Sequence, residues 1–218
     1  KLKNTFLKST NLMLLVNYQV EKIKLNLMAI STGFKKIKTA VFISGTGSNL
    51  KNLIKFSKIK KSPISIDLII SDNSRAKGLN FGKIFKIKKK IYNFNKKNIA
   101  EKKILLELKK NNISFICLAG FMKIISKNFI KMFKGKILNI HPSLLPKYKG
   151  LNTHQRAIDN NEKFSGCSVH YVTSRLDSGK IILQKKVKIK KNETQKSLAK
   201  KVLIQEHKLY PRAILKVL

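Results

Sequence analysis

The sequence predicts an α/β fold with a mostly parallel central sheet flanked by helices. From residue 38 onward, short apolar segments alternate with longer segments in which apolar residues recur at helical spacing. Such alternation is typical of βαβ units, whose strands run parallel and whose helices cover the sheet. Loops rich in glycine, proline or amide residues follow three of the apolar segments. Because parallel strands end at one edge of a sheet, we expect these loops to meet there and form a ligand site.

The expected elements follow in order along the chain. Apolar and β-branched residues predict strands at residues 39–44, 64–71, 113–118 and 136–140. Helical periodicity predicts helices at residues 49–60, 75–88, 98–111 and 126–133. Beyond them, the pattern predicts a pair of strands joined by a turn at RLDSGK and then a closing helix, at residues 168–173, 180–189 and 194–217.

The chain is strongly basic, with 48 lysine and arginine residues against 10 acidic residues and a formal net charge of +38. A basic excess of this size is compatible with nucleic-acid binding. Only four of the 48 are arginine, however, and the lysines fall on nearly every segment. A protein that reads bases is expected to use more arginine, whose planar fork matches base and phosphate edges. We therefore expect no specific nucleic-acid partner.

Other features of the composition bear on where the protein works. No apolar run approaches the ~18 residues that a membrane-spanning helix needs, so we expect no membrane segment. Cys117 and Cys167 lie among apolar or small residues, with no cysteine or histidine at metal-ligand spacing. We expect them to be buried free thiols of a cytoplasmic protein without a metal site. A monomer and a homodimer are both compatible with the sequence.

Residues 1–36 differ from the rest of the chain. They hold scattered lysines, with no clear capping or turn signal. A basic segment poor in acids is compatible with a targeting peptide, although this one has no arginine. The simpler interpretation is an N-terminal extension, either disordered or an over-long start with Met28 as a candidate first residue. Residues 37–218 are then the functional domain.

A glycine-rich turn follows the first predicted strand. Gly45 and Gly47 free the backbone after the apolar residues 41–43, and Ser48 is a plausible N-cap for the helix that follows. A helix start leaves several N–H groups without partners and carries the positive end of the helix dipole, so the turn can hold an anion. Such a turn also occurs without any ligand, and this one motif leaves both interpretations open.

An amide, an imidazole and a carboxylate are candidates for catalysis. Asn139 and His141 lie two residues apart at the end of a strand, so both side chains can point the same way. Asp177 is one of only ten acids and stands in a basic tract. The amide and an imidazolium can stabilise an oxyanion, while the carboxylate raises the histidine pKa and orders a proton-carrying water. A lone strand-end histidine is more often a hydrogen-bonded structural residue, and it is the presence of Asp177 that favours catalysis here.

Five segments of the chain form a recognisable set: FISGTGSNL, LAGFMKIIS, ILNIHPSLLPKYKGLNTHQRAI, GCSVHYVTSRLDSGKIILQ and QEHKLYP. Together they closely resemble the phosphoribosylglycinamide formyltransferase family of purine synthesis. The resemblance implies a Rossmann-like formyltransferase fold over residues 37–218. It also implies transfer of a formyl group from 10-formyltetrahydrofolate, the co-substrate, to the amine of glycinamide ribonucleotide, without a metal ion. In this family His141 would be the catalytic acid or base, Asn139 the oxyanion donor and Asp177 the residue that tunes the histidine.

The resemblance further implies which residues bind the two substrates. The substrate's phosphate and ribose would be held by Gly47, Ser48, Asn49 and Glu206. The folate would be bound by Lys97, Met122, Lys123, Ile124, Ile125 and Asn139. The family usually has an arginine where this chain has Lys97, and a lysine cannot form a bidentate fork with a carboxylate. Ser174, Arg175 and Lys180 also depart from the family pattern around Asp177.

Three alternative functions share part of this pattern. Methionyl-tRNA formyltransferases share the Asn-His-Asp set, but they carry a C-terminal RNA-binding domain and only about forty residues follow Asp177 here. Formyltetrahydrofolate hydrolases carry an N-terminal regulatory domain, for which the first 38 residues are too few. A nucleic-acid-binding protein on a formyltransferase scaffold would be expected to have an interrupted active site, and the motif residues here are intact.

Overall fold

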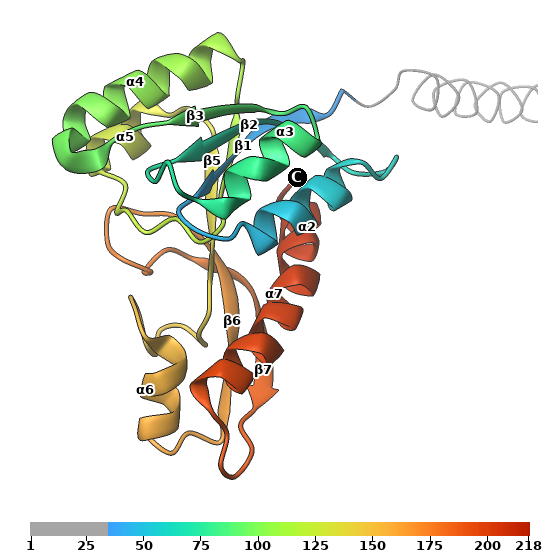
Figure 1. Cartoon of the computed structure of the whole chain (residues 1–218), viewed down its shortest axis with the longest axis vertical. Coiled ribbons are helices and arrows are strands. Elements are labelled where there is room, and N and C mark those ends of the chain that lie inside the picture. The colour runs from blue at the N-terminus through green and yellow to red at the C-terminus, as the bar shows by residue number, and fades with distance from the viewer. Residues whose placement is uncertain (1–34) are drawn as a thin grey trace, which may run out of the picture. The chain divides into compact units, whose positions relative to one another are not determined.

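A computed structural model describes residues 35–218, which are built around one seven-stranded sheet (Figure 1). The strand order is β3-β2-β1-β4-β5-β6-β7. The strands are β1 Ile37–Ile43, β2 Ile64–Ser71, β3 Lys88–Ile91, β4 Phe115–Leu118, β5 Lys136–His141, β6 Phe164–Tyr171 and β7 Ile181–Lys188. Strands β1 to β5 are parallel, whereas β6 runs antiparallel to β5 and β7 antiparallel to β6. The predicted α/β class with a mostly parallel sheet is confirmed.

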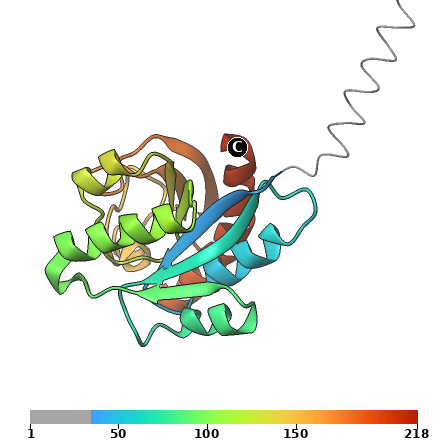
Figure 2. The ribbon, with the colours of Figure 1, turned by 90° about the horizontal axis from the view of Figure 1, so that it is seen from above.

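Helices cover both faces of this sheet. The α-helices are α2 Ser48–Ser57, α3 Asn80–Ile84, α4 Lys97–Lys110, α5 Lys127–Met132, α6 Thr153–Asp159 and α7 Gln195–Val217, and two short 3-10 helices are η1 Lys77–Leu79 and η2 Phe94–Lys96. Figure 2 shows α2 and α4 on opposite sides of the parallel strands. No helix within residues 35–218 is both long enough and apolar enough to cross a membrane.

Alternate residues of β1 supply the two cores on either side of the sheet. Val41 and Ile43 belong to a cluster that includes residues of α2 and α7. Ala40 and Phe42 point the other way, into a cluster with residues of α4 and α5, such as Ile104. All four β1 residues are fully buried, as expected for a central strand covered on both faces. This burial holds the carboxyl end of β1, and the loop after it, in a fixed position.

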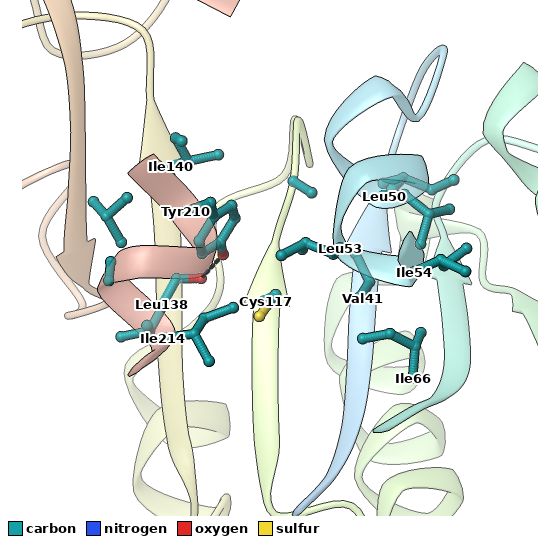
Figure 3. Close-up of a cluster of buried hydrophobic side chains, with 14 of the residues drawn as sticks. Val41, Leu50, Leu53, Ile54, Ile66, Cys117, Leu138, Ile140, Tyr210 and Ile214 are labelled. Atoms are coloured by element: carbon teal, nitrogen blue, oxygen red, sulfur yellow. Dashed lines mark hydrogen bonds between the residues drawn. The ribbon is translucent and has the colours of Figure 1, made fainter. Parts of the chain in front are cut away.

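Tyr210 joins α7 to the sheet. Its ring is fully buried beside Leu138, Ile140 and Ile214 (Figure 3). Its hydroxyl lies 3.1 Å from the carbonyl oxygens of both Leu118 and Leu138, to which it donates its one proton. The Leu118 carbonyl ends β4 and the Leu138 carbonyl lies within β5, so the contact ties α7 to β4 and to β5, the strand that carries Asn139 and His141. Burial raises the pKa of Tyr210 well above its usual value, and the hydroxyl stays neutral.

Three elements differ from the sequence prediction. The helix expected at 75–88 is short and ends at Ile84, because Lys86 adopts a left-handed conformation with φ 55°. Residues 88–91 then form the edge strand β3 beside β2. Three of the four residues of β3 are exposed lysines, so no apolar pattern in the sequence predicts this strand. Helix α6 was not predicted either, because its apolar content is low and its N-cap, Asn152, lies in a loop with left-handed geometry.

Residues 37–218 form one compact unit, the range expected to be the functional domain. The expectations for residues 1–34 lie outside the described residues.

Candidate active site

A cavity of about 870 Å³ lies at the carboxyl edge of the parallel strands. The loops after β1, β4 and β5 all contribute to its lining, as the sequence predicts. The lining includes eleven of the twelve candidate residues: Gly47, Ser48, Asn49, Met122, Lys123, Ile124, Ile125, Asn139, His141, Asp177 and Glu206. Lys97, the first residue of α4, does not line this cavity.

The glycine turn brings backbone N–H groups to the cavity. Gly47, rather than Ser48, is the N-cap of α2, with φ 73°, and no side chain caps this helix start. A methyl group added at Gly47 would lie 2.7 Å from Cα of Gly78, so the two backbones approach too closely for any side chain. The first N–H groups of α2 are therefore available to an anion in the cavity.

A buried polar pair lies next to this turn. The Asn49 amide nitrogen donates to Oε2 of Glu206, on α7, at 2.7 Å. Burial raises the pKa of Glu206, and the hydrogen bond from Asn49 partly offsets this rise. Within the described residues, Oδ1 of Asn49 is buried and has no hydrogen-bond partner. An unpaired buried acceptor is costly, so the pair is suited to a ligand that carries hydroxyl groups.

His141 ends β5 and is 5% exposed. Its Nε2 lies 2.9 Å from the carbonyl oxygen of Tyr148, and its Nδ1 lies 3.3 Å from Oδ2 of Asp177. Burial lowers the pKa of His141, while the Tyr148 carbonyl and the Asp177 carboxylate favour the protonated ring and limit the fall. The ring is thus a neutral base whose protonated form finds two acceptors already in place.

Asp177 stands at the turn between β6 and β7, with a left-handed φ of 44°. Its Oδ2 accepts the backbone N–H of Gly150 at 2.9 Å. Burial opposes ionisation, but the contact with His170 and the Gly150 N–H outweigh it and hold the pKa of Asp177 below its usual value. The carboxylate is therefore charged at neutral pH and stabilises a proton on His141.

Asn139 and a further histidine complete the cluster. The Asn139 amide nitrogen lies 3.4 Å from Oδ1 of Asp177 and 3.2 Å from Nε2 of His170. His170 faces Asn139 across the antiparallel β5–β6 pair, and its Nδ1 lies 2.8 Å from the Tyr171 carbonyl. Because that carbonyl only accepts, Nδ1 donates to it. The other ring nitrogen, Nε2, lies between the Asn139 amide and Oδ1 of Asp177, which is 3.6 Å away. The sequence analysis did not identify His170. The feature that could have identified it is a polar residue at an inward-facing position of a buried strand.

The loop after β4 forms another part of the lining. The side chains of Met122 and Ile124 are 61% and 54% exposed, whereas Ile125 is 3% exposed. Exposed apolar side chains at the mouth of a cavity are typical of a site for a flat, partly apolar ligand. Within residues 35–218, no group of three or more histidine, cysteine or acidic residues is placed to hold a metal ion.

Known proteins are similar to this chain in sequence and in fold. A family model described as formyl transferase matches residues 37–214. The human trifunctional purine biosynthetic protein adenosine-3 is 42% identical over 183 residues, which cover 83% of this chain but 18% of that protein. Phosphoribosylglycinamide formyltransferase of Escherichia coli is 37% identical over 80% of this chain and 84% of its own length. The crystal structure of phosphoribosylglycinamide formyltransferase from Brucella melitensis has a TM-score of 0.80 and 40% identity, covering 84% of this chain and 96% of that one.

Proposed function

The chain belongs to the formyl transferase family, and we propose that it transfers a formyl group from 10-formyltetrahydrofolate to the amine of 5′-phosphoribosylglycinamide in purine synthesis. One observation carries this proposal. Asp177 contacts both the Asn139 amide and the His141 ring inside the cavity onto which the uncapped start of α2 opens. A proton carrier, an oxyanion donor and an anion site thus lie in one cavity.

We propose that the α2 start holds the ribonucleotide. The backbone N–H groups of Ser48 and Asn49, after Gly47, would bind the 5′-phosphate, where the helix dipole adds to the hydrogen bonds. Glu206 and the unpaired Oδ1 of Asn49 would accept hydrogen bonds from the ribose hydroxyls. This arrangement satisfies the one acceptor of Asn49 that lacks a partner in the described residues.

The folate is proposed to lie along the loop after β4. The backbone of residues 122–125 would recognise the polar edge of the pterin, while the exposed side chains of Met122 and Ile124 would cover its apolar body. Lys97 stays the proposed partner of the acidic tail, which would extend beyond the cavity lining. Since an ammonium is a point charge, this contact would be less directional than an arginine fork.

The proposed reaction forms a C–N bond and breaks another. The neutral amine attacks the formyl carbon, and the electron pair of the carbonyl moves to oxygen. Asn139 would donate to this oxyanion by releasing its longer contact, the one with Asp177. His141, alone or through a water, would accept the proton of the attacking amine and return it to the leaving folate nitrogen. Asp177 would stabilise the imidazolium between these two steps.

A direct assay tests this function. The protein is incubated with 5′-phosphoribosylglycinamide and 10-formyltetrahydrofolate, and release of tetrahydrofolate is followed. We expect turnover with this acceptor and none when methionyl-tRNA replaces it. Turnover with the tRNA alone would instead assign the chain to tRNA formylation, and release of formate without an acceptor would indicate a hydrolase.

We further propose that the enzyme works in the cytoplasm. Its two cysteines in the described residues, Cys117 and Cys167, are buried free thiols, which suits a reducing compartment. Burial raises the pKa of both thiols to about 12, so neither is a nucleophile at neutral pH.

A further inference from the structure

The loop after β4, residues 120–126, has anchors at both ends, outside the cavity. Near its start, the backbone N–H of Met122 donates to Oγ of Ser44 at 2.8 Å. The Ser44 hydroxyl in turn donates to Oδ1 of Asp72 at 2.5 Å. A hydroxyl has one proton, so the carboxylate fixes the direction of that proton and leaves a lone pair for the Met122 N–H. The position of Met122 therefore depends on Asp72 through Ser44.

Asp72 is well placed to set this geometry. Its side chain is 8% exposed, and it follows β2, whereas Ser44 follows β1 and Met122 follows β4. Strand β1 lies between β2 and β4 in the sheet, so the chain of contacts runs sideways along the sheet edge. The neighbouring Asn73 amide also donates to the Ser44 carbonyl at 3.1 Å. The side chain of Lys123, within the loop, lies 3.8 Å from Oδ2 of Asp72.

The other end of the loop is held by a second carboxylate. Glu101, on α4, is 4% exposed. Its Oε1 accepts the backbone N–H of Ser126 at 2.9 Å, and its Oε2 accepts the Ser126 hydroxyl. The same hydroxyl accepts the N–H of Phe129 at 3.0 Å and caps α5. Ser126 is thereby held by three hydrogen bonds at the point where the loop enters the helix.

Carboxylates are scarce in this chain. It has ten acidic residues in all, and two of these stand buried at the two ends of one loop. Neither Asp72 nor Glu101 lines the cavity, so neither contacts a ligand there. Burying a carboxylate costs more free energy than burying an apolar residue of similar size. A carboxylate at such a position therefore serves to fix the geometry of its hydrogen-bond partners rather than to stabilise the fold. Residues 122–124 are exposed, so burial of their side chains does not fix the loop between the two anchors.

We propose that Asp72, acting through Ser44, and Glu101 are positioning residues that fix the loop backbone in the conformation that binds folate. This inference rests on the proposed function, since it assigns the loop to the folate. It extends that function because neither carboxylate touches a substrate. Preorganised backbone donors lose less entropy on binding, so their effect is expected in folate affinity rather than in the chemical step.

The test measures the affinity for tetrahydrofolate and for 5′-phosphoribosylglycinamide separately, by titration of each variant. Ser44→Ala removes the first anchor and Glu101→Leu the second. Each is expected to raise the Kd for tetrahydrofolate about tenfold, while the Kd for the ribonucleotide changes less than about twofold. Glu101→Gln, which keeps an acceptor for the Ser126 N–H, is expected to restore most of the affinity lost in Glu101→Leu.

Ser65→Ala is the matched control. The Ser65 hydroxyl donates to Oδ2 of Asp67 at 2.6 Å, a serine–aspartate pair on β2 that does not line the cavity. This variant loses the same hydroxyl-to-carboxylate contact as Ser44→Ala, and its tetrahydrofolate Kd is expected to stay unchanged. Melting temperatures are recorded for all variants, because a purely structural anchor would lower Tm without changing the Kd of the folded protein.

The outcomes separate this inference from the proposed function. If the unsubstituted protein does not bind tetrahydrofolate, the proposed function itself fails. If it binds and both Ser44→Ala and Glu101→Leu bind equally well, the function stands and the positioning role is wrong. An equal loss of affinity for both ligands would also overturn it, since that result indicates general damage to the site.

Discussion

His141 and Asp177 are joined by a 3.3 Å contact between Nδ1 and Oδ2, although they lie 36 positions apart in the sequence. The contact links a strand end of the parallel sheet to the turn between two antiparallel strands. The carboxylate is held ionised by the Gly150 N–H and by His170, while burial keeps the His141 ring neutral. The pair is thus a neutral base beside a negative charge that stabilises its protonated form.

His141→Ala is expected to lower kcat by about 10²-fold or more, the usual scale of a lost general acid–base group. The affinity for tetrahydrofolate should change little, because within residues 35–218 no hydrogen bond joins the His141 ring to the loop after β4. Steady-state kinetics and titration of the variant check both expectations. Near-normal turnover in a folded His141→Ala protein would remove the residue from the mechanism.

Asp177→Asn is expected to lower kcat and to move the acidic limb of the pH–rate profile to lower pH. The Asp177 charge favours the protonated His141 ring and so raises its pKa, against the larger lowering by burial. Removing the charge takes the His141 pKa still lower, and the neutral base persists at more acidic pH. A profile of kcat/KM against pH measures the shift. An acidic limb at the same pH in both proteins would show that Asp177 does not act on His141.

Gly47→Ala is expected to weaken binding of 5′-phosphoribosylglycinamide and to lower Tm. The added methyl group would lie 2.7 Å from Cα of Gly78 at a residue whose φ is 73°, so the start of α2 must shift. Strain of this kind costs on the order of 1–3 kcal/mol. Gly45→Ala is the control for stability, because a methyl group there meets nothing within 4 Å. Equal Tm values for the two variants would contradict the close approach at Gly47.

Glu206→Gln is expected to raise the Tm at neutral pH while raising the KM for 5′-phosphoribosylglycinamide about tenfold. Burial raises the folded-state pKa of Glu206, so the folded protein gains stability when the group is protonated and loses it as pH rises above the unfolded-state pKa. A neutral glutamine avoids that loss but gives the ribose a weaker acceptor. Thermal melts at pH 5 and pH 8 should show a gain in Tm that is larger at pH 8. A lower Tm for the variant at both pH values would show that the carboxylate stabilises the fold.

The net charge of +38 is expected to produce only salt-sensitive nucleic-acid binding. Raising salt from about 50 to 200 mM should reduce the affinity for a random oligonucleotide by on the order of 10³-fold, because released counterions supply its free energy. The KM for 5′-phosphoribosylglycinamide should rise about tenfold at most, since backbone hydrogen bonds hold its phosphate. Both are measured over one salt series. Salt-resistant, sequence-selective binding in a protein without transferase activity would favour a nucleic-acid function.

Local sequence was enough for the parallel sheet and for the edge where the site lies. The apolar residues 41–43 and the glycines after them predict a strand and a turn, because burial and positive φ are properties of single residues and their neighbours. Asn139 and His141 share a side of β5 through the two-residue period of a strand. Both features depend on contacts close in the chain, so they can be read from a single sequence.

Only the tertiary structure decided which groups meet. His170 reaches Asn139 through the register of β5 and β6, and Asp177 reaches His141 through a left-handed turn. The exposed lysines of β3 form a strand because the edge of β2 is free to pair with them, although their own pattern predicts no strand. Lys97 begins α4 outside the cavity lining, which its spacing from the other candidates did not reveal. In each case long-range backbone pairing or packing outweighs local preference, because the energy of these contacts is realised only once distant segments have come together.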